Sequence, residues 1–337
     1  MGKVAVIFGG SGFIGSHFSA YLLKNNLVDS VVIADLVEPR FDKFGNVASQ
    51  VLTKSNVHYQ FCDVREKITI STGSVVLVAN FAAIHREPGH QSIEYFETNI
   101  KGAENVCEWV SSVRCEKLIF TSSIAPYGPT EEEKFENSVP VPISAYGASK
   151  LVAEKIHLAW QAEDKSARKL VIVRPGVVYG PGEGGNVTRL VRAVLKGYFF
   201  YMGNRNTRKA GTYVKELCNA MWWVLENRTD EGVALFNMSM NPGPTIEQYV
   251  NVVCDTAKVT KFTPSLPYWF LYPCSVCLDI LSKPFGIQNS ISPVRLRKLV
   301  KSNNIIPKFL DNKNYSYMYS FQESMADWKY DCESDWQ

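Results

Sequence analysis

Apolar residues in this chain fall into short runs that alternate with longer amphipathic stretches. The first run, Lys3-Val-Ala-Val-Ile-Phe8, is followed by a glycine-rich loop and then by a helix-like stretch from Ser16 to Lys24. A second run, Val31-Val-Ile-Ala-Asp35, comes next. Unbroken apolar runs of this length are typical of strands that are buried on both faces of a parallel sheet.

The same alternation continues through the first half of the chain. Strands are predicted at Val57–Phe61, Val75–Phe81, Lys117–Thr121 and Leu170–Arg174, and helices at Ile93–Val113 and Ala145–Ala162. Strands and helices that alternate in this way predict an α/β fold with a doubly wound parallel sheet of the Rossmann type.

The regular alternation ends near Gly180-Pro-Gly182-Glu-Gly-Gly185. Beyond it we expect helices at Asn186–Lys196 and Val214–Leu225, and a strand at Val233–Met238 that returns to the first sheet. The remaining sequence is interrupted by prolines and suits a smaller C-terminal substrate lobe over the carboxyl ends of the strands. The predicted division is a dinucleotide-binding domain of residues 1–180 with 210–240, and a lobe of residues 181–209 and 241–337.

The loop Gly9-x-x-Gly12-x-x-Gly15 stands between a predicted strand and a predicted helix. Glycines there allow a tight turn, let the backbone approach a pyrophosphate, and precede a helix N-terminus that can bind phosphates. Asp35 ends the second strand twenty residues after Gly15. A carboxylate at that position binds ribose hydroxyls and repels a 2′-phosphate, which favours NAD. Arg40 lies nearby in sequence and keeps NADP as the alternative.

Groups suited to hydride-transfer chemistry follow in order. Ser123 comes after a predicted strand, and Tyr146 and Lys150 lie one turn apart if Ser144 caps the next helix. The Lys150 ammonium and an oxidised nicotinamide would lower the pKa of the phenol from about 10, so that Tyr146 can accept a proton from a substrate hydroxyl. Ser123 would stabilise charge on the same oxygen. The alternative is a half-buried helix tyrosine beside a solvated lysine.

Composition narrows the class of protein. The 337 residues carry a net charge of +3 with dispersed basic residues, so nothing supports nucleic-acid binding. The N-terminus enters a strand at once without the pattern of a signal peptide, and we expect a cytoplasmic protein. Its eight cysteines read as reduced thiols without metal-ligand spacing, and we expect no metal. The one exception is Cys274-Ser-Val-Cys277, a lone C-x-x-C for which metal or redox chemistry stays an alternative.

Together these motifs resemble the extended short-chain dehydrogenase/reductase superfamily, in particular its nucleotide-sugar epimerases. The resemblance runs from Gly9 to about Leu225 and includes the signature from Arg174 to Gly182. It implies bound NAD, a homodimer, and Ser123, Tyr146 and Lys150 as the catalytic triad. By this resemblance NAD would contact Gly9, Gly12, Phe13, Ile14, Gly15, Asp35, Asp63, Val64, Ala82, Ala83, Asn99, Tyr146, Lys150 and Pro175.

A sugar diphosphate is the substrate that the resemblance implies. Guanidinium groups bind phosphate through paired hydrogen bonds, so arginines after Gly185 are candidate anchors, with a solvated basic surface as the alternative. His85 is a further candidate, although a lone histidine is more often structural. The predicted substrate contacts are His85, Ser122, Ser123, Asn186, Arg189, Arg205 and Arg208, with Arg192 and Lys209 as further candidate anchors.

One departure from the superfamily narrows the reaction. Sugar 4,6-dehydratases carry Asp-Glu directly after the catalytic Thr, whereas this chain has Ser123-Ile124. Short stretches at Ala82–Arg86, Phe120–Ser123, Leu278–Lys283 and Ser292–Lys298 resemble bacterial epimerases that act at C4 of N-acetylglucosamine linked through diphosphate to undecaprenol, and their UDP-N-acetylhexosamine relatives. This implies an NAD-dependent 4-epimerase for surface polysaccharide synthesis, working through a transient 4-keto sugar. The alternatives are an NAD(P)-dependent 4-keto-sugar nucleotide reductase and a non-catalytic NAD-binding regulator.

The most apolar segment, Leu266–Leu278, is too short and too interrupted by proline to cross a bilayer, which needs about 20 apolar residues. It is aromatic and is followed by Arg295, Arg297, Lys298 and Lys301. Packing into the substrate lobe or into a dimer interface is the favoured interpretation of this segment. Peripheral contact of residues 266–301 with the inner face of a membrane is the alternative.

Overall fold

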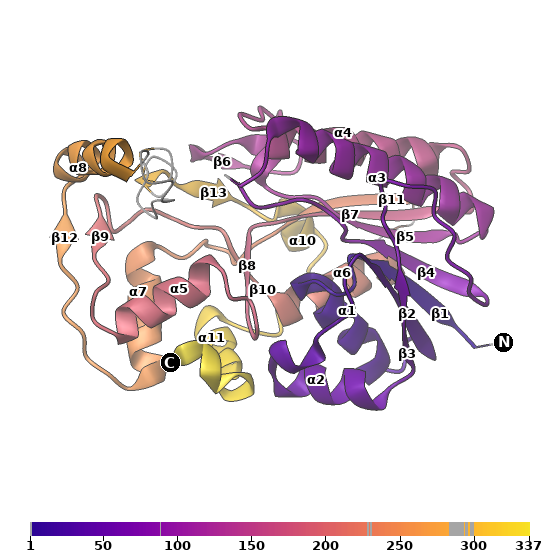
Figure 1. The fold of residues 1–337 in the computed structure, drawn as a ribbon, viewed down its shortest axis with the longest axis horizontal. Coiled ribbons are helices and arrows are strands. Elements are labelled where there is room, and N and C mark those ends of the chain that lie inside the picture. Colours follow the sequence, from indigo (N-terminus) through magenta and orange to yellow (C-terminus); the bar gives the residue numbers. More distant parts are fainter. Residues whose placement is uncertain are drawn as a thin grey trace.

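The computed structural model describes residues 2–87, 89–227, 229, 231–282, 293, 296 and 300–337. Its centre is a seven-stranded sheet in the order β3-β2-β1-β4-β5-β7-β11, with every neighbouring pair parallel (Figure 1). These strands are β1 (Val4–Phe8), β2 (Ser30–Asp35), β3 (Val57–Phe61), β4 (Val75–Asn80), β5 (Lys117–Thr121), β7 (Lys169–Pro175) and β11 (Val233–Met238). The predicted doubly wound sheet is confirmed, including the returning strand β11 at its edge.

Helices cover both faces of this sheet. The face toward α3 (Ser92–Ser112) and α4 (Ala145–Ala162) holds one apolar core, and the face toward α1 (Phe13–Lys24) and α6 (Val214–Asn227) holds another (Figure 1). The helix α2 (Gly45–Lys54) packs beside α1. The strands β1, β5 and β7 are buried on both faces because their sequences are largely apolar, whereas the edge strand β3 is only partly buried.

The first helix starts earlier than predicted. It begins at Phe13 rather than Ser16, because Gly12 is its N-cap and the chain enters the helix inside the glycine loop. The order of strands also reverses here: β1 has β2 on one side and β4 on the other. In open α/β sheets, ligands bind outside the carboxyl ends of the strands at such a reversal.

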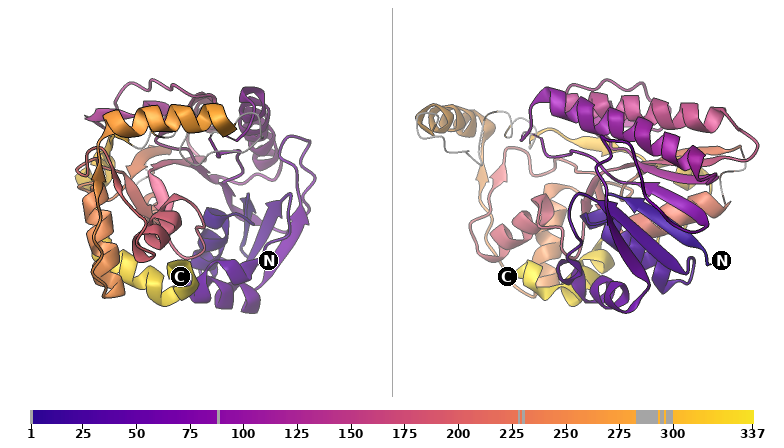
Figure 2. Two further views of the ribbon diagram at one scale, coloured as in Figure 1. Left: turned by 60° about the vertical axis from the view of Figure 1, so that its left-hand side comes forward. Right: turned by 45° about the vertical axis from the view of Figure 1, so that its right-hand side comes forward.

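A second group of elements forms the lobe beside the sheet (Figure 2). Its core surrounds the fully buried Tyr179, Tyr213 and Trp328. The short strands pair in parallel as β8–β10, β9–β12 and β6–β13. The elements are β6 (Thr130–Lys134), β8 (Val177–Tyr179), α5 (Asn186–Leu195), β9 (Tyr201–Met202), β10 (Gly211–Tyr213), α7 (Ile246–Ala257), β12 (Ser265–Leu266), α8 (Tyr268–Ser282), β13 (Asn303–Ile305), α10 (Lys308–Asn312) and α11 (Phe321–Asp331), with short 3-10 helices at Phe41–Lys43, Ala125–Tyr127 and Glu333–Trp336.

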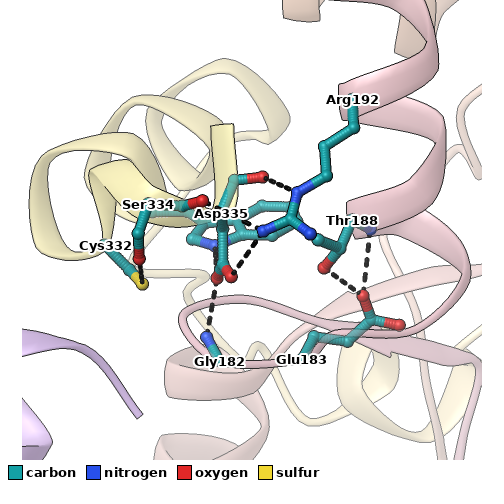
Figure 3. Close-up of polar contacts among 8 residues, drawn as sticks. Gly182, Glu183, Thr188, Arg192, Cys332, Ser334 and Asp335 are labelled. Atoms are coloured by element: carbon teal, nitrogen blue, oxygen red, sulfur yellow. Dashed lines mark hydrogen bonds and ion pairs between the residues drawn. The ribbon is translucent and has the colours of Figure 1, made fainter. Parts of the chain in front are cut away.

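The C-terminus fastens the loop by which the chain leaves the first sheet. The Asp335 carboxylate accepts hydrogen bonds from the backbone N–H of Gly182 at 2.8 Å and from the indole of Trp328 at 2.9 Å (Figure 3). Arg192 of α5 donates to the backbone oxygens of Asp335 at 3.1 Å and Ser334 at 3.0 Å. The loop after β8, the helix α5 and the chain end are thereby held as one unit.

The helix α11 connects the two halves of the molecule. Its Asp331 accepts a hydrogen bond from the N–H of Val47 on α2 at 2.8 Å and pairs with Lys215 of α6 at 3.0 Å. Lys215 also contacts Asp327 at 2.6 Å. Residues beyond 241 thus contact both parts of the fold, and the predicted domain division at residues 180 and 241 stays a prediction.

The apolar segment forms one continuous helix. The helix α8 runs from Tyr268 to Ser282 with Pro273 inside it, so the proline does not break it. Among the helices of the described ranges, none combines the length and the apolar character needed to span a membrane. The predicted motif residues Lys283, Arg295, Arg297 and Lys298 lie outside the described residues.

The anchoring of the C-terminus leads to a first prediction. Trp328→Ala removes a fully buried indole and its hydrogen bond to Asp335, and we expect the free energy of unfolding to fall by about 3–5 kcal/mol. Urea denaturation measures this loss. Tyr330→Ala, on the same helix but with an 87% exposed side chain, is the control and should change stability by less than about 0.5 kcal/mol. Equal effects from the two variants would contradict this account of the anchor.

Candidate active site

The glycine loop forms a cradle with backbone on all sides. A Cβ atom at Gly9, where φ is +72°, would lie 2.6 Å from the backbone nitrogen of Ala82, and one at Gly15 would lie 2.4 Å from the carbonyl oxygen of Gly9. No side chain caps the N-terminus of α1, and its first turn holds no acidic residue. Phe13 and Ile14 begin this helix. The loop therefore fits a dinucleotide pyrophosphate at a helix N-terminus.

Asp35 lies beside this loop at the end of β2. Its carboxylate accepts hydrogen bonds from the backbone N–H groups of Ser11 at 3.0 Å and Val37 at 3.4 Å. The Ser11 hydroxyl in turn donates to the carbonyl oxygen of Val37 at 2.5 Å. These contacts fix a negative charge next to the glycine loop, where it suits ribose hydroxyls and disfavours a 2′-phosphate.

Asp63, one of the predicted NAD contacts, already has a protein partner. Both carboxylate oxygens of Asp63 accept hydrogen bonds from Arg65, the shorter at 2.6 Å, and these bonds lower the pKa of Asp63. Val64 is buried, and its side chain packs against Gly102 of α3. Asp63 therefore has less capacity to bind an adenine amino group than its motif suggested, and its role stays a prediction.

Asn99 joins the segment after β4 to the helix that carries Tyr146. Its side chain accepts a hydrogen bond from the N–H of Ile84 at 2.9 Å and donates to the carbonyl oxygen of Ile84 at 3.1 Å. It also donates to the hydroxyl of Ser149 at 2.9 Å, and Ser149 donates to the carbonyl oxygen of Tyr146. The half-buried Ala82 and Ala83 directly precede Ile84. Asn99 thus positions both segments, a role that sequence reasoning missed.

Close packing sets Tyr146 beside Ser123. Ser144 caps α4 by accepting a hydrogen bond from the N–H of Gly147 at 3.2 Å, as predicted. A Cβ atom at Gly147 would lie 2.8 Å from the carbonyl oxygen of Ala125, so only glycine allows the helix to come this close. The Ser123 hydroxyl lies near enough to the Tyr146 phenol to act on it, in the direction that lowers the pKa of the phenol. Two of the three predicted catalytic groups are therefore neighbours.

The neighbouring hydroxyl points the other way. The segment after β5 continues along β7, since the N–H of Ser122 bonds to the carbonyl oxygen of Val173 at 2.8 Å and that of Ile124 to the carbonyl oxygen of Pro175 at 3.2 Å. Alternate side chains of an extended segment face opposite sides. Ser122 is buried, and its hydroxyl donates to Glu154 at 2.5 Å. The structure therefore does not bring Ser122 to the substrate side, contrary to prediction.

Glu154 is the centre of a buried ionic network beneath the site. Arg174 donates to its two carboxylate oxygens at 2.8 Å and 2.6 Å, and both side chains are almost fully buried. Arg174 also donates to the hydroxyl of Tyr127, which donates to Asn237 at 2.9 Å. Breaking one partner of a buried pair leaves an uncompensated charge. This network ties α4 to the end of β7 and was not predicted, although Glu154 follows Lys150 by one helical turn.

Lys150 lies in an apolar, buried position. Its ammonium nitrogen donates to the carbonyl oxygen of Thr121 at 2.8 Å and lies 4.9 Å from the centroid of the Phe120 ring. Burial lowers the pKa of Lys150 to about 7, opposed by the negative charge of Glu154. The prediction of a solvated lysine, the alternative considered from sequence, is wrong.

The pKa of the Tyr146 phenol differs from the prediction. Burial raises the pKa of Tyr146 to about 12, and only the hydrogen bond with Ser123 acts to lower it. We predicted that Lys150 lowers this pKa, but the lysine is itself so desolvated that its charged form is disfavoured. At pH 7 Tyr146 therefore stays protonated, and Lys150 is close to the midpoint of its titration.

The predicted substrate contacts are spread around the lobe. His85 follows β4, and its pKa is lowered by desolvation and by the charges of Lys150 and Arg86, which places it near Lys150. Asn186 and Arg189 begin α5, are exposed, and are joined by a 2.6 Å hydrogen bond. Their contact with substrate stays a prediction.

The remaining cationic candidates have protein partners. Arg205 is exposed and pairs with Glu247 at 3.2 Å, and Arg208 donates to the carbonyl oxygen of Gly243 at 2.6 Å. Lys209 donates to the carbonyl oxygen of Lys301 at 2.5 Å. Arg192 is engaged by the C-terminus, as described above (Figure 3). Of the predicted anchors, Arg189 and Arg205 keep the most accessible guanidinium groups.

Cysteine and metal chemistry find no support among the described residues. Cys274 and Cys277 are free thiols on the exposed side of α8. Within the described part of the chain, no group of three or more His, Cys, Asp and Glu side chains could hold a metal ion.

Comparison with known proteins decides the family. A model described as the NAD dependent epimerase/dehydratase family matches residues 5–238. The chain belongs to this family. The predictions of an NAD-dependent epimerase of the extended short-chain dehydrogenase/reductase type, and of NAD as its cofactor, are confirmed.

Relatives of this NAD-dependent epimerase include enzymes with lipid-linked and nucleotide-linked substrates. The N-acetyl-alpha-D-glucosaminyl-diphospho-ditrans,octacis-undecaprenol 4-epimerase of Escherichia coli O157:H7 is 27% identical over 332 residues, which is 96% of this chain and 94% of the relative. The UDP-N-acetylglucosamine 4-epimerase from Methanobrevibacter ruminantium, solved with UDP-N-acetylmuramic acid, has a TM-score of 0.72 at 20% identity, covering 97% of this chain and 96% of its own. The NAD complex of the Thermus thermophilus UDP-glucose 4-epimerase has a TM-score of 0.68 at 22% identity, with 96% of each chain covered.

The buried lysine of this epimerase leads to a prediction about pH. The folded pKa of Lys150 is about 7 against an ordinary 10.5, so the unfolded chain binds more protons between these values. The free energy of unfolding should therefore fall as the pH drops from 10 to 7, by at most about 1.4 kcal/mol per unit from this group. Lys150→Met lacks this loss and should be more stable than wild type at pH 7, with the advantage shrinking toward pH 10.

Urea denaturation of both proteins across this pH range measures the difference. Lys155→Met, at an exposed position on the same helix, is the control and should follow the wild-type pH dependence. An advantage of Lys150→Met that stays constant with pH would contradict the shifted pKa.

Proposed function

We propose that this NAD-dependent epimerase inverts C4 of an N-acetylhexosamine linked through diphosphate to a carrier. The observation that carries the proposal is the placement of the Ser123 hydroxyl beside the Tyr146 phenol, with Lys150 one turn further along α4 and the glycine cradle at the end of β1, which β4 separates from β5. The relative that acts on N-acetylglucosaminyl-diphospho-undecaprenol aligns over 96% of the chain and supports a polyprenyl carrier. The UDP-linked sugar is the other carrier consistent with relatives.

The cofactor cradle fits the NAD that the family uses. The N-terminus of α1 and the loop from Gly9 to Gly15 would hold the pyrophosphate, and Asp35 the adenosine ribose. NAD, when bound, would supply the hydride acceptor and return the hydride to the sugar.

Proton transfer falls to Tyr146. As the phenolate, its oxygen would accept the proton of the C4 hydroxyl as hydride leaves that carbon, and would return it after the 4-keto sugar has turned over. The Ser123 hydroxyl would donate a hydrogen bond to the C4 oxygen as negative charge develops there. Because burial holds the pKa of Tyr146 at about 12, positive charge close to the phenol must assist this step.

The ketone can turn over only if the diphosphate is held and the sugar is not. Arg189 at the start of α5 and Arg205 after β9 are exposed cations on separate elements of the lobe. Paired hydrogen bonds from guanidinium to phosphate oxygens would hold the diphosphate from that side. On binding the phosphate, Arg189 would give up its hydrogen bond to Asn186, and Arg205 its ion pair with Glu247.

The role of Tyr146 gives a direct test. The purified protein should release NAD when denatured, whereas a reductase exchanges its nicotinamide at each turnover. Tyr146→Phe should keep this NAD and lose turnover by about 10²–10⁴-fold, because it removes only the proton-transfer group. Tyr198→Phe, with a 63% exposed ring, is the matched control and should retain full activity. Unchanged turnover in Tyr146→Phe would refute this mechanism.

The substrate is tested with two carriers. Incubation with UDP-N-acetylglucosamine and with N-acetylglucosaminyl-diphospho-undecaprenol, followed by separation of the sugar epimers, should give the C4 epimer from the diphosphate-linked sugar. Arg205→Ala should raise KM with little change in kcat, since the side chain would bind ground state and transition state alike. Conversion of neither substrate would contradict the proposal.

A further inference from the structure

The helix α8 is apolar nearly all round yet stands largely uncovered. Trp269 is 75% exposed, Ile280 61% and Phe270 49%. Its buried side consists of Leu271 and Ser275, one turn apart. A helix that is apolar on all sides belongs in a protein core or in contact with lipid.

The helix lies at the far end of the lobe, attached through β12, and the right-hand view of Figure 2 shows it projecting beyond the other elements. At its base, Tyr268 and Val300 lie close to Gly203 after β9. Among the α8 side chains whose burial is described, Leu271 and Ser275 are buried, whereas Trp269 and Phe270 are exposed.

The exposed surface has the composition of a membrane-interface element. Tyr268, Trp269 and Phe270 form its first turn, and Trp and Tyr favour the boundary between headgroups and acyl chains. Its length of 15 residues, about 22 Å, is too short to cross a bilayer but suits a helix lying in its surface.

Charge distinguishes a membrane from a second copy of the chain. By sequence alone, residues 283–301 hold five basic residues and no acidic one, namely Lys283, Arg295, Arg297, Lys298 and Lys301. Basic residues that follow an apolar helix in sequence are attracted to anionic headgroups. Two copies meeting at this segment would bring like charges together instead.

We infer that α8 is a monotopic membrane anchor that inserts its Trp269–Phe270 side into an anionic bilayer. This inference rests on the proposed function in one respect: a polyprenyl-linked sugar resides in that bilayer. Docking by α8 holds the substrate lobe against the surface from which the diphosphate and its sugar project.

Flotation with vesicles of phosphatidylethanolamine and phosphatidylglycerol tests the anchor on the full chain with its NAD. The wild type should float with lipid at low salt. Trp269→Asp/Phe270→Asp should weaken this by about tenfold or more, since two large apolar side chains are withdrawn from the interface. Tyr330→Asp, at an 87% exposed ring on α11, is the matched control and should float like wild type. Retained NAD shows that each variant is folded.

A second measurement avoids the risk of misfolding. Brominated lipids should quench wild-type tryptophan fluorescence, and Trp269→Phe should lose most of that quenching while floating nearly as well. Wild-type protein that stays with the soluble fraction, or a double variant that floats equally, would overturn the inference. So would conversion of a dimer to a monomer by the double variant, because that result assigns α8 to a second copy.

Flotation requires no turnover, so the two proposals fail separately. Vesicle binding without epimerisation of either substrate would contradict the proposed function and support the anchor. Epimerisation without vesicle binding would do the reverse.

Discussion

The site depends on how closely α4 packs against the segment that follows β5. Gly147 permits this approach, because any Cβ there would meet the carbonyl oxygen of Ala125. The approach places Tyr146 beside Ser123 and holds Lys150 in a buried position, where it donates to the carbonyl oxygen of Thr121. The ionic bonds between Glu154 and Arg174 hold the same helix to the end of β7. A slightly looser helix would solvate the lysine and separate the two hydroxyls.

Burial of Lys150 and Tyr146 destabilises the folded protein. It lowers the pKa of Lys150 to about 7 and raises that of Tyr146 to about 12, so both groups resist the charged forms that catalysis uses. Active sites commonly hold groups in states that oppose stability. Here the opposing shifts make the proton of Tyr146 sensitive to any charge that enters the site, and the family's cofactor supplies a positive one. In the proposed mechanism, the same burial that destabilises the fold therefore makes proton transfer depend on cofactor binding.

Sequence predicted the parts of this arrangement that follow from local pattern. The unbroken apolar runs predicted the strands, and Ser144 predicted the start of α4. The glycines and Asp35 predicted the edge of the sheet at which the cofactor binds. Contacts between segments that are distant in the chain could not be predicted from the sequence. Ser122 was placed at the substrate because it adjoins Ser123, but the pleat turns it inward to Glu154. Arg192 looked like a phosphate anchor until the chain end, 143 residues later, took its hydrogen bonds.

A short path connects the outlying helix to the catalytic strands. Tyr268 of α8 and Val300 both approach Gly203, which opens the loop that carries Arg205. That loop leads to Ala210, whose carbonyl oxygen accepts a hydrogen bond from Val177 at 2.7 Å and whose side chain packs with Tyr127. Tyr127 in turn contacts Arg174 of the buried network. A bilayer that holds α8 would therefore also hold the loop with Arg205, which is proposed to bind the diphosphate, relative to Ser123 and Tyr146. Inversion at C4 in the proposed mechanism requires these two parts of the pocket to keep a fixed relation.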